Sequence, residues 1–293
     1  MNLFNQYYPP NSDAFHQLVL KQVKDALAED IGTGDLTASL VPVAQLVSAT
    51  IIARETAIIC GIPWVQTCFN QVDAKVHINW QVVEGDRVQV NQILCEITGP
   101  ARALLTAERC ALNFLQTLSA TATETRKYVD AIAGTGAQIL DTRKTIPNFR
   151  LAQKYAVTIG GGQNQRLALY DGILIKENHI AAAGSIDAVM AQAFALNSGK
   201  SIQIEVENIP QLKEALAAGA TSVLLDNFST EQLAEAVSFN HQSGKLAVLE
   251  ASGGIDLKNV REIALAGVDR ISIGAITKNI QATDLSMRIT HTN

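Results

Sequence analysis

The chain has 293 residues, of which 47% are hydrophobic and 17% are charged. These proportions are typical of a protein with a sizeable core, and they exclude an intrinsically disordered chain. The formal net charge of −5 excludes binding of nucleic acid through a general excess of basic residues. The first lysine is Lys21 and no run of about 18 apolar residues occurs, so we expect neither a signal peptide nor a membrane-spanning helix.

The first part of the chain predicts one helix followed by short strands. Apolar residues at a helical spacing predict a helix over residues 13–29 that ends before Gly32. Runs typical of strands follow, with glycine and proline between them. Residues 101–129 lack Gly and Pro and predict a long helix, which the Ser/Thr cluster at 119–123 could divide in two. The expected strands cover residues 47–53, 57–60, 88–90 and 93–97.

The cysteines in this part of the chain are best explained as free thiols. None of the four forms a CxxC pair, and His77 is the only histidine close to them in the sequence. We therefore expect neither a zinc site nor a disulfide framework, which favours a reducing, cytoplasmic location. The four are Cys60, Cys68, Cys95 and Cys110.

After Gly134 short apolar runs alternate with helical segments. Gly219, Gly244 and Gly267 mark the ends of the three later helices. This alternation predicts parallel βαβ units. Because six strands are evident, we expect an incomplete, open α/β barrel rather than a closed eight-stranded one. The six runs cover residues 138–140, 172–175, 202–204, 222–225, 246–249 and 270–273.

These patterns divide the chain into two domains of an α/β protein. Residues 1–115 are expected to form an N-terminal α/β sandwich domain, and residues 116–276 are expected to form the barrel. A C-terminal helix over residues 277–293 is expected to pack on the N-terminal domain.

Charged or small residues follow every expected barrel strand. In βα barrels the carboxyl ends of the strands form the mouth at which the active site lies. We therefore expect an active site built from these segments. The six strand ends are Asp141-Thr142-Arg143-Lys144, Lys176-Glu177-Asn178-His179, Glu205-Val206-Glu207, Asp226-Asn227, Glu250-Ala251-Ser252-Gly253-Gly254 and Gly274-Ala275.

Two of these groups favour binding of a phosphorylated ligand. The small residues of Ser252–Gly254 and Gly274 would let backbone N–H groups approach a phosphate closely. Glu205 and Asp226, on neighbouring strands, are of the residue type that holds Mg²⁺ near phosphates. Proton transfer by paired acids, or an ion pair with a nearby cation, remain alternatives for these two carboxylates.

Basic residues gather at the same strand ends of a chain whose net charge is negative. Arg143, Lys144, Arg166 and Lys176 would converge on carboxylates or phosphates, for which arginine offers a bidentate fork and lysine a point charge. Lys176 could instead form a Schiff base, which keeps an aldolase-type lyase open. Arg109, on the long helix, is a further cation whose alternative role is that of a solvated surface residue.

Five segments stand out in chain order, at residues 28–37, 107–114, 141–145, 172–179 and 250–255. Together they resemble the quinolinate phosphoribosyltransferase family, and the resemblance covers the chain from about residue 20 to the end. It implies an α/β N-terminal domain, an incomplete α/β barrel and a homodimer with shared active sites. It also implies phosphoribosyl transfer from phosphoribosyl pyrophosphate to the ring nitrogen of quinolinate with Mg²⁺, giving nicotinate mononucleotide, pyrophosphate and CO₂ for NAD biosynthesis.

The resemblance implies roles for individual residues. Arg109 would reach the site from the partner subunit, and Glu205 and Asp226 would bind the Mg²⁺-coordinated diphosphate and the ribose. Residues implied to be catalytic are Arg109, Arg143, Lys144, Lys176, Glu205 and Asp226. Those implied to bind substrate are the same six with Thr142, Gln165 and Arg166. Those implied to bind the 5′-phosphate are Ser252, Gly253, Gly254, Ile273, Gly274, Ala275 and Lys278.

Three positions depart from the family pattern. Gln165 stands where the family has histidine, so it keeps hydrogen bonding but not a titratable group. Lys278 replaces a frequent histidine, and Asn91 replaces a common glycine. The alternatives to the quinolinate reaction are a related phosphoribosyltransferase for another ring acid, a lyase that uses Lys176, and a non-catalytic dimer that binds nucleotides or phosphates.

Overall fold

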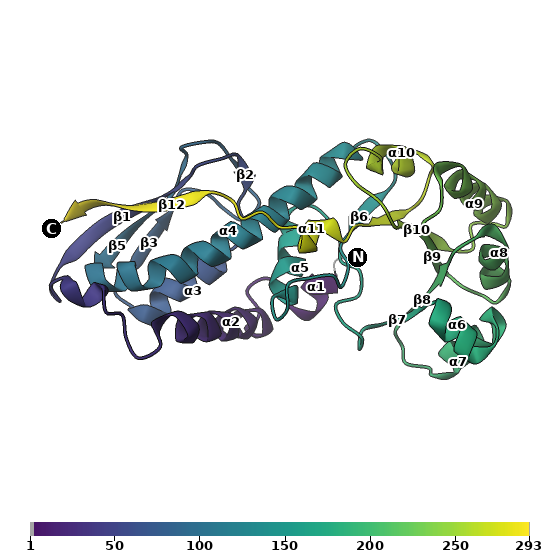
Figure 1. The fold of residues 1–293 in the computed structure, drawn as a ribbon, viewed down its shortest axis with the longest axis horizontal. Helices are drawn as coiled ribbons and strands as arrows, with labels where there is room; N and C mark the ends of the chain where they lie inside the picture. The colour runs from purple at the N-terminus through teal and green to yellow at the C-terminus, as the bar shows by residue number, and fades with distance from the viewer. Residues whose placement is uncertain (1–2, 293) are drawn as a thin grey trace. The chain divides into compact units, whose positions relative to one another are not determined.

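The structure, a computed structural model, describes residues 3–292 and divides into two compact units. We call them the barrel unit and the N-terminal unit (Figure 1). The barrel unit comprises Thr125–Val157 and Gly161–Lys278. The N-terminal unit comprises Phe4–Glu124, Thr158–Gly160 and the chain from Asn279 on.

The barrel unit is built on a curved parallel sheet of six strands in the order β6-β11-β10-β9-β8-β7. Strands β6 and β7 lie at the two ends of this order and do not pair, so the barrel is open. The expectation of an incomplete α/β barrel is therefore confirmed. The strands are β6 (Gln138–Leu140), β7 (Gly172–Ile175), β8 (Ser201–Val206), β9 (Ser222–Asp226), β10 (Val248–Ser252) and β11 (Arg270–Ser272).

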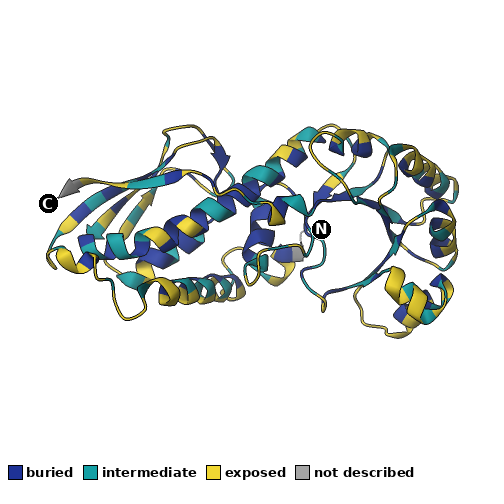
Figure 2. Cartoon of the chain, viewed as in Figure 1, coloured by how far each residue is buried: buried dark blue, intermediate teal, exposed yellow. Residues whose placement is uncertain are grey.

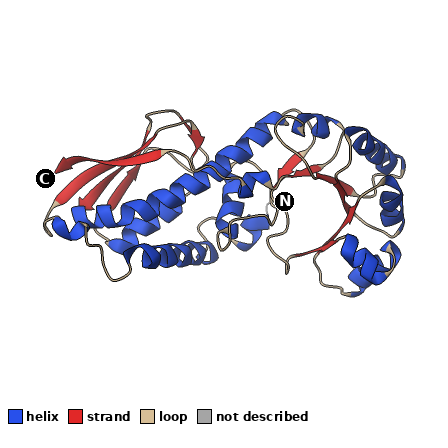
Figure 3. Cartoon of the chain, in the orientation of Figure 1, coloured by secondary structure: helices blue, strands red, loops and turns tan. Residues whose placement is uncertain are grey.

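Helices cover the outer face of this sheet (Figure 3). Ser185, Asn208 and Ser229 cap three of them, each accepting a backbone N–H of the first turn. Because strand side chains alternate between faces, apolar residues such as Ile204 and Val223 join the core under the helices, and the polar residues between them line the barrel interior. The helices are α5 (Arg150–Ile159), α6 (Glu177–Ala183), α7 (Ile186–Ala195), α8 (Ile209–Ala217), α9 (Thr230–Gln242), α10 (Val260–Leu265) and α11 (Ala275–Lys278).

The N-terminal unit packs helices against an antiparallel sheet of the order β12-β1-β5-β3. Helix α2 buries Phe15, Val19, Val23 and Leu27, which recur every four residues along one face. Trp64 of α3 packs edge-on against Phe15, with ring centroids 5.8 Å apart. The elements are α1 (Leu3–Tyr7), α2 (Asp13–Ile31), the 3₁₀ turn η1 (Ala38–Leu40), β1 (Leu46–Ala53), β2 (Ala57–Ile58), α3 (Ile62–Val72), β3 (His77–Trp80), β4 (Arg87–Val88), β5 (Ile93–Pro100), α4 (Ala101–Ala131) and β12 (Leu285–Thr292).

The expected C-terminal helix over residues 277–293 is wrong. Helix α11 ends at Lys278, and Leu285–Thr292 forms β12, which pairs antiparallel with β1. Pairing satisfies the backbone groups along that edge of β1, and the β-branched residues of the segment favour a strand. Residue 293 lies outside the described residues.

The long helix α4 runs without a break from Ala101 to Ala131, so the Ser/Thr cluster does not divide it. Its hydroxyls instead hold the segment of β2: Thr123 accepts the N–H of Ile58 at 2.8 Å, and Ser119 accepts that of Cys60 at 3.0 Å. Along the chain, the boundary between the two compact units falls between Glu124 and Thr125 of this helix, nine residues after the expected domain end at 115 (124 − 115). Burial along α4 and the barrel strands can be followed in Figure 2. None of the helices in residues 3–292 has the length and hydropathy that a membrane span requires.

Candidate active site

The carboxyl ends of the barrel strands lie at one mouth, because all six strands are parallel. The register places Ser252 of β10 directly opposite Asp226 of β9. Lys176 follows β7, and Glu205 lies on β8 one residue beyond the pair formed by Ile175 and Ile204. Most of the residues singled out in the sequence are therefore brought to one end of one sheet.

Lys176 and Glu205 form an ion pair with 2.6 Å between Nζ and Oε2. The Glu205 side chain is only 11% exposed, whereas the Lys176 side chain is 43% exposed at the mouth. The backbone N–H of Lys176 donates to Nδ1 of His179, which fixes the start of α6. The ion pair with Lys176, which the sequence left as an alternative for Glu205, is thus present.

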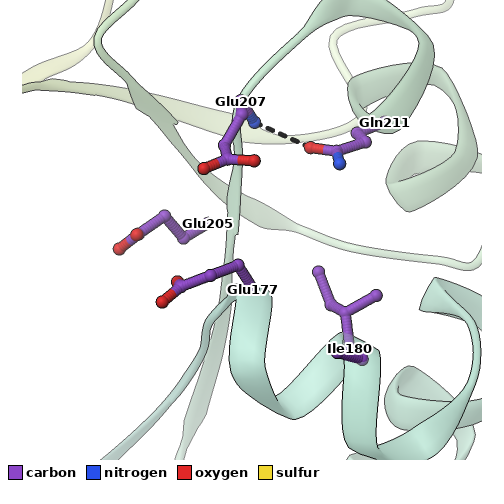
Figure 4. A pocket seen from close by; sticks show the side chains of 6 residues that line it. Glu177, Ile180, Glu205, Glu207 and Gln211 are labelled. Atoms are coloured by element: carbon purple, nitrogen blue, oxygen red, sulfur yellow. Dashed lines mark hydrogen bonds between the residues drawn. The ribbon is translucent and has the colours of Figure 1, made fainter.

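A cavity of about 180 Å³ opens beside Glu205 (Figure 4). The carboxylates of Glu177 and Glu205 point to the same side of it in the close-up. The N–H of Glu207 is bonded to Gln211 of α8 at 2.8 Å, which holds the end of β8 against that helix. The cavity is lined by Glu177, Ile180, Ala181, Glu205, Glu207 and Gln211.

A buried ion pair behind the mouth positions the loop that carries Gln165 and Arg166. Asp141 and Lys154 are both fully buried, and Nζ of Lys154 donates to Oδ1 of Asp141. Asp141 also accepts the side chain of Asn164 at 2.8 Å and the backbone N–H of Gln165 at 2.9 Å. Burial raises the pKa of Asp141 and lowers the pKa of Lys154. Asp141 is thus a structural anchor of the loop and not an open ligand.

Two arginines converge where this loop passes β7. Nη1 of Arg166 donates to the carbonyl of Gly172 at 3.0 Å. Burial, and after it the positive charge of Arg143, lower the pKa of Arg166. The Nε of Arg143 is buried without a hydrogen-bond partner. Two neighbouring guanidinium groups, one with an unpaired buried N–H, form a site that an anion would complete.

Gln165 is engaged on both sides of its amide. Its Oε1 accepts the backbone N–H of Arg166 at 2.6 Å, and its Nε2 donates to Oε1 of Gln203 at 2.6 Å. Gln203 in turn donates to Glu250 at 2.9 Å. Gln165 is therefore tied into the barrel interior.

The glycine-rich strand ends are closely packed backbone. A Cβ on Gly253, whose φ is +95°, would lie 2.1 Å from Oδ1 of Asn227. The N–H of Asn227 donates to the carbonyl of Ser252 at 2.9 Å, so the ends of β9 and β10 are joined. A Cβ on Gly274 would lie 3.0 Å from Cδ of Lys144. At Gly253 the positive φ and the contact with Asn227 favour glycine, whereas at Gly274 the flexible Lys144 side chain could move aside.

The other expected residues differ in how they are placed. Thr142 is half-buried and accepts the N–H of Lys144 at 3.0 Å, while Lys144 is exposed. Ile273 is buried, so only its backbone can face a ligand. Lys278 is exposed at the end of α11. Arg109 is exposed on α4, in the N-terminal unit.

Sequence reasoning missed Lys154 and Gln203 as parts of the site, and it named Glu250 as a strand-end residue without assigning it a role. Lys154 lies in a helix stretch in which every residue from Ala152 to Val157 is buried, and a lysine within such an apolar run is the signal that could have revealed it. Gln203 and Glu250 lie inside strands, where a polar residue gives no sign of its partner.

The carboxylates fit Mg²⁺ only as a partner of a bound diphosphate. Among the described residues no group of three or more His, Cys, Asp or Glu side chains could hold a metal ion. Glu205 is paired with Lys176, and Asp226 accepts Nδ2 of Asn227 at 2.8 Å. Two carboxylates at adjacent strand ends suit a cation that takes most of its oxygen ligands from phosphates and water.

The site combines an open barrel, the pair of Arg143 and Arg166, and glycine-rich strand ends. These features define a class of enzyme that binds acidic, phosphorylated substrates at the carboxyl ends of parallel strands. The family model "Quinolinate phosphoribosyl transferase, C-terminal domain" matches residues 121–288, and the model of the N-terminal domain matches residues 35–119. The chain belongs to the quinolinate phosphoribosyltransferase family.

Relatives and solved structures agree with this membership. The chain is 38% identical over 279 residues to the probable nicotinate-nucleotide pyrophosphorylase (carboxylating) of Bacillus subtilis, covering 95% of this chain and 96% of that protein. It is 37% identical to the Mycobacterium leprae enzyme, with 94% and 99% covered. The structure of the nicotinate-nucleotide pyrophosphorylase from Francisella tularensis superposes with a TM-score of 0.90 at 46% identity, covering 94% of this chain and 97% of that one.

Proposed function

We propose that this chain transfers the phosphoribosyl group of phosphoribosyl pyrophosphate to the ring nitrogen of quinolinate and releases pyrophosphate and CO₂. The product is nicotinate mononucleotide, which feeds NAD biosynthesis. The observation that carries the proposal is the convergence of Arg143 and Arg166 in the barrel unit whose strand ends carry the Lys176–Glu205 pair. A substrate with two carboxylates needs such a cationic pocket.

The chain's cations would hold the ring acid and orient it. Arg143, Arg166 and Lys176 would pair with the two carboxylates, which leaves the ring nitrogen directed at C1 of the ribose. The nitrogen lone pair forms the new N–C1 bond as the C1–O bond to diphosphate breaks. The positively charged ring then accepts the electron pair of the breaking C–CO₂ bond, and water protonates the ring carbon.

The diphosphate would bind between the acidic strand ends and the glycine loops. Glu205 and Asp226 would hold Mg²⁺ and the ribose hydroxyls. Charge neutralisation on the departing diphosphate is the chemistry that Mg²⁺ supplies when it is bound. Ser252–Gly254 and Gly274-Ala275 would donate backbone N–H groups to the 5′-phosphate, with Lys144 and Lys278 adding positive charge.

A homodimer with Arg109 supplied by the partner subunit is part of the proposal. The 35–41 segment is held to α4, because Arg102 donates to the carbonyl of Val41 at 2.7 Å and Thr106 donates to Asp35 at 2.9 Å. Arg109 lies seven residues after Arg102 (109 − 102) and so on the same face of this helix.

Apolar side chains are exposed next to that face. Leu36 and Leu40 are 87% and 83% exposed, and Val43 is 74% exposed. Such a patch favours a contact with another protein surface, and a second copy of this chain would cover it and carry Arg109 to a neighbouring barrel. The buried free cysteines fit a reducing compartment such as the cytoplasm.

The activity is tested by incubating the protein with quinolinate, phosphoribosyl pyrophosphate and Mg²⁺ and following nicotinate mononucleotide. We expect product that depends on Mg²⁺ and is not formed when nicotinic acid replaces quinolinate. Product from another pyridine acid alone would assign the chain to a different ring substrate. Absence of any phosphoribosyl transfer would overturn the proposal.

The shared site is tested by mixing two inactive variants, Arg109→Ala and Arg143→Ala, after dissociating and reassociating the subunits. If Arg109 acts across the interface, each mixed dimer has one intact site, and random mixing restores about a quarter of the sites. No recovery of activity, although mixed dimers are detected by native mass spectrometry, would contradict an Arg109 supplied by the partner.

The Lys176-dependent lyase gains no support from the geometry. Lysines that form Schiff bases are activated by an apolar pocket or by another cation. Lys176 is instead paired with a carboxylate at 2.6 Å. Borohydride reduction with a carbonyl substrate should therefore leave the mass of the protein unchanged.

A further inference from the structure

A continuous line of hydrogen bonds crosses the barrel interior from the Arg166 backbone to a buried acid. The N–H of Arg166 donates to Oε1 of Gln165 at 2.6 Å. Nε2 of Gln165 donates to Oε1 of Gln203 at 2.6 Å, and Nε2 of Gln203 donates to Oε2 of Glu250 at 2.9 Å. We call Gln165, Gln203 and Glu250 the amide relay.

The direction of donation along the amide relay is fixed. A backbone N–H can only donate, so the oxygen of Gln165 must face Arg166 and its NH₂ group must face Gln203. The oxygen of Gln203 is then turned to Gln165 and its NH₂ group to Glu250, which has to accept. Hydrogen bonds aligned in one direction polarise and strengthen one another.

The relay is expensive for the fold. Gln203 is 6% exposed and Glu250 is 1% exposed, and they lie on β8 and β10 with β9 between them. Burial raises the pKa of the Glu250 carboxyl, and hydrogen bonding by Gln203 and Ser272 offsets this only in part. Apolar residues of similar size would fill the same space at lower cost. Because the amide relay is unfavourable for folding and ends at the backbone of Arg166, we infer that it has a role at the site.

We propose that Gln203 and Glu250 are positioning residues for the ring acid, acting through Gln165 on Arg166. This inference rests on the proposed function. The relay holds the peptide N–H of Arg166 while Gly172 holds its guanidinium, so the arginine is fixed at both ends before substrate arrives. The positioning uses neutral amides where the family resemblance implies a histidine at residue 165, so it adds no titration near neutral pH at that position.

The test compares Gln203→Met with the wild type in separate measurements of quinolinate KM and phosphoribosyl pyrophosphate KM. Methionine keeps the length of the side chain but makes none of the two hydrogen bonds. We expect quinolinate KM to rise about tenfold, with the KM for the sugar donor changed less than about twofold. The double variant Gln165→Met/Gln203→Met should raise quinolinate KM no more than the single variant with the larger effect, because both residues act through the same amide relay.

Two further variants separate positioning from general destabilisation. Asn240→Leu removes another buried amide of the barrel unit, one that makes two hydrogen bonds with Ala247. It should lower the melting temperature without a selective change in quinolinate KM. Glu250→Leu removes the acceptor for Gln203 and should raise quinolinate KM. Glu250→Gln keeps an acceptor for Gln203 and should raise quinolinate KM much less.

Three outcomes would overturn the inference: equal changes in both KM values, additive effects of the two glutamine variants, or the same KM pattern for Asn240→Leu. Should Gln203→Met fail to fold, Gln203→Asn keeps the amide on a shorter side chain, and the same loss selective for quinolinate is expected. A wild-type protein that does not consume quinolinate would instead defeat the proposed function, so the two failures are distinguishable.

Discussion

The two units of the chain bury different kinds of side chain. In the barrel unit the buried residues include four with a carboxylate or ammonium group: Asp141, Lys154, Asp171 and Glu250. In the described part of the N-terminal unit, the buried polar residues are the hydroxyls Ser119, Thr121 and Thr283. Burying a charge costs far more free energy than burying a hydroxyl that has a partner. This chain accepts that cost in the unit that carries the candidate site.

Three of the buried ionisable groups lie next to the loop that carries Arg166. Lys154 and Asp141 hold the backbone of Gln165, and Asp171 accepts the N–H groups of Leu167 and Ala168. In the N-terminal unit Glu84 also holds backbone, since it accepts the N–H groups of Gly61 and Ile62 at 2.8 and 2.6 Å, but this residue is only partly buried. The comparison therefore predicts that charge deletions harm the barrel unit most.

The largest expected effect is that of Lys154→Met on stability. It leaves Asp141 buried without its cation, so we expect the free energy of unfolding to fall by about 3–5 kcal/mol in urea denaturation followed by circular dichroism. Lys21→Met breaks the exposed pair with Asp25 in the N-terminal unit and serves as control. An equal shift in both denaturation midpoints would contradict the comparison.

The next largest effect is that of Glu205→Gln on catalysis. The change removes the carboxylate that pairs with Lys176 at 2.6 Å, and we expect kcat/KM to fall about 100-fold. Glu214→Gln, at an exposed position of α8, should change it less than about threefold. Similar losses for both variants would indicate a general effect of removing negative charge from the barrel unit.

A matched pair of glycine variants probes the phosphate loop. In Gly253→Ala the new methyl group meets Asn227, whereas Gly254, with φ of +61°, has no atom within 4 Å of its added Cβ. Both variants carry the penalty of a positive φ, so their difference isolates the close packing. We expect Gly253→Ala alone to raise phosphoribosyl pyrophosphate KM, by about tenfold. Equal KM values in steady-state assays would argue against this loop as the phosphate site.

The smallest effect concerns the thiols of the N-terminal unit. Burial raises the pKa of Cys68 and of Cys95 from the ordinary 9.0 to about 12, so these thiols stay protonated in the folded state. The folded state then binds more protons than the unfolded state above pH 9.0, and the free energy of unfolding should fall as pH rises from there toward about 12. At pH 8 a thiol reagent should label the cysteines only after denaturation.

The sequence predicted the six barrel strands. Apolar runs that alternate with helices indicated a parallel sheet, and parallel strands place the residues that follow them, such as Lys176, Glu205 and Asp226, at one end of that sheet. The prediction failed at residues 277–293, because a short C-terminal segment takes its structure from the open edge of β1. It also failed at 119–123, where hydroxyls that weaken an isolated helix are bonded to a neighbouring strand segment.

The sequence by itself determined the architecture of the barrel and the class of ligand. The periodicity of apolar residues predicted the barrel, and the residue types at the strand ends indicated an anionic, phosphorylated substrate. What only the tertiary structure decided was the pairing of buried polar groups. The pairs Lys154–Asp141, Gln165–Gln203 and Gln203–Glu250 are joined across 13, 38 and 47 positions of the chain. No local pattern encodes such partners, because a buried charge or amide is stabilised by whichever group the fold brings within hydrogen-bond distance.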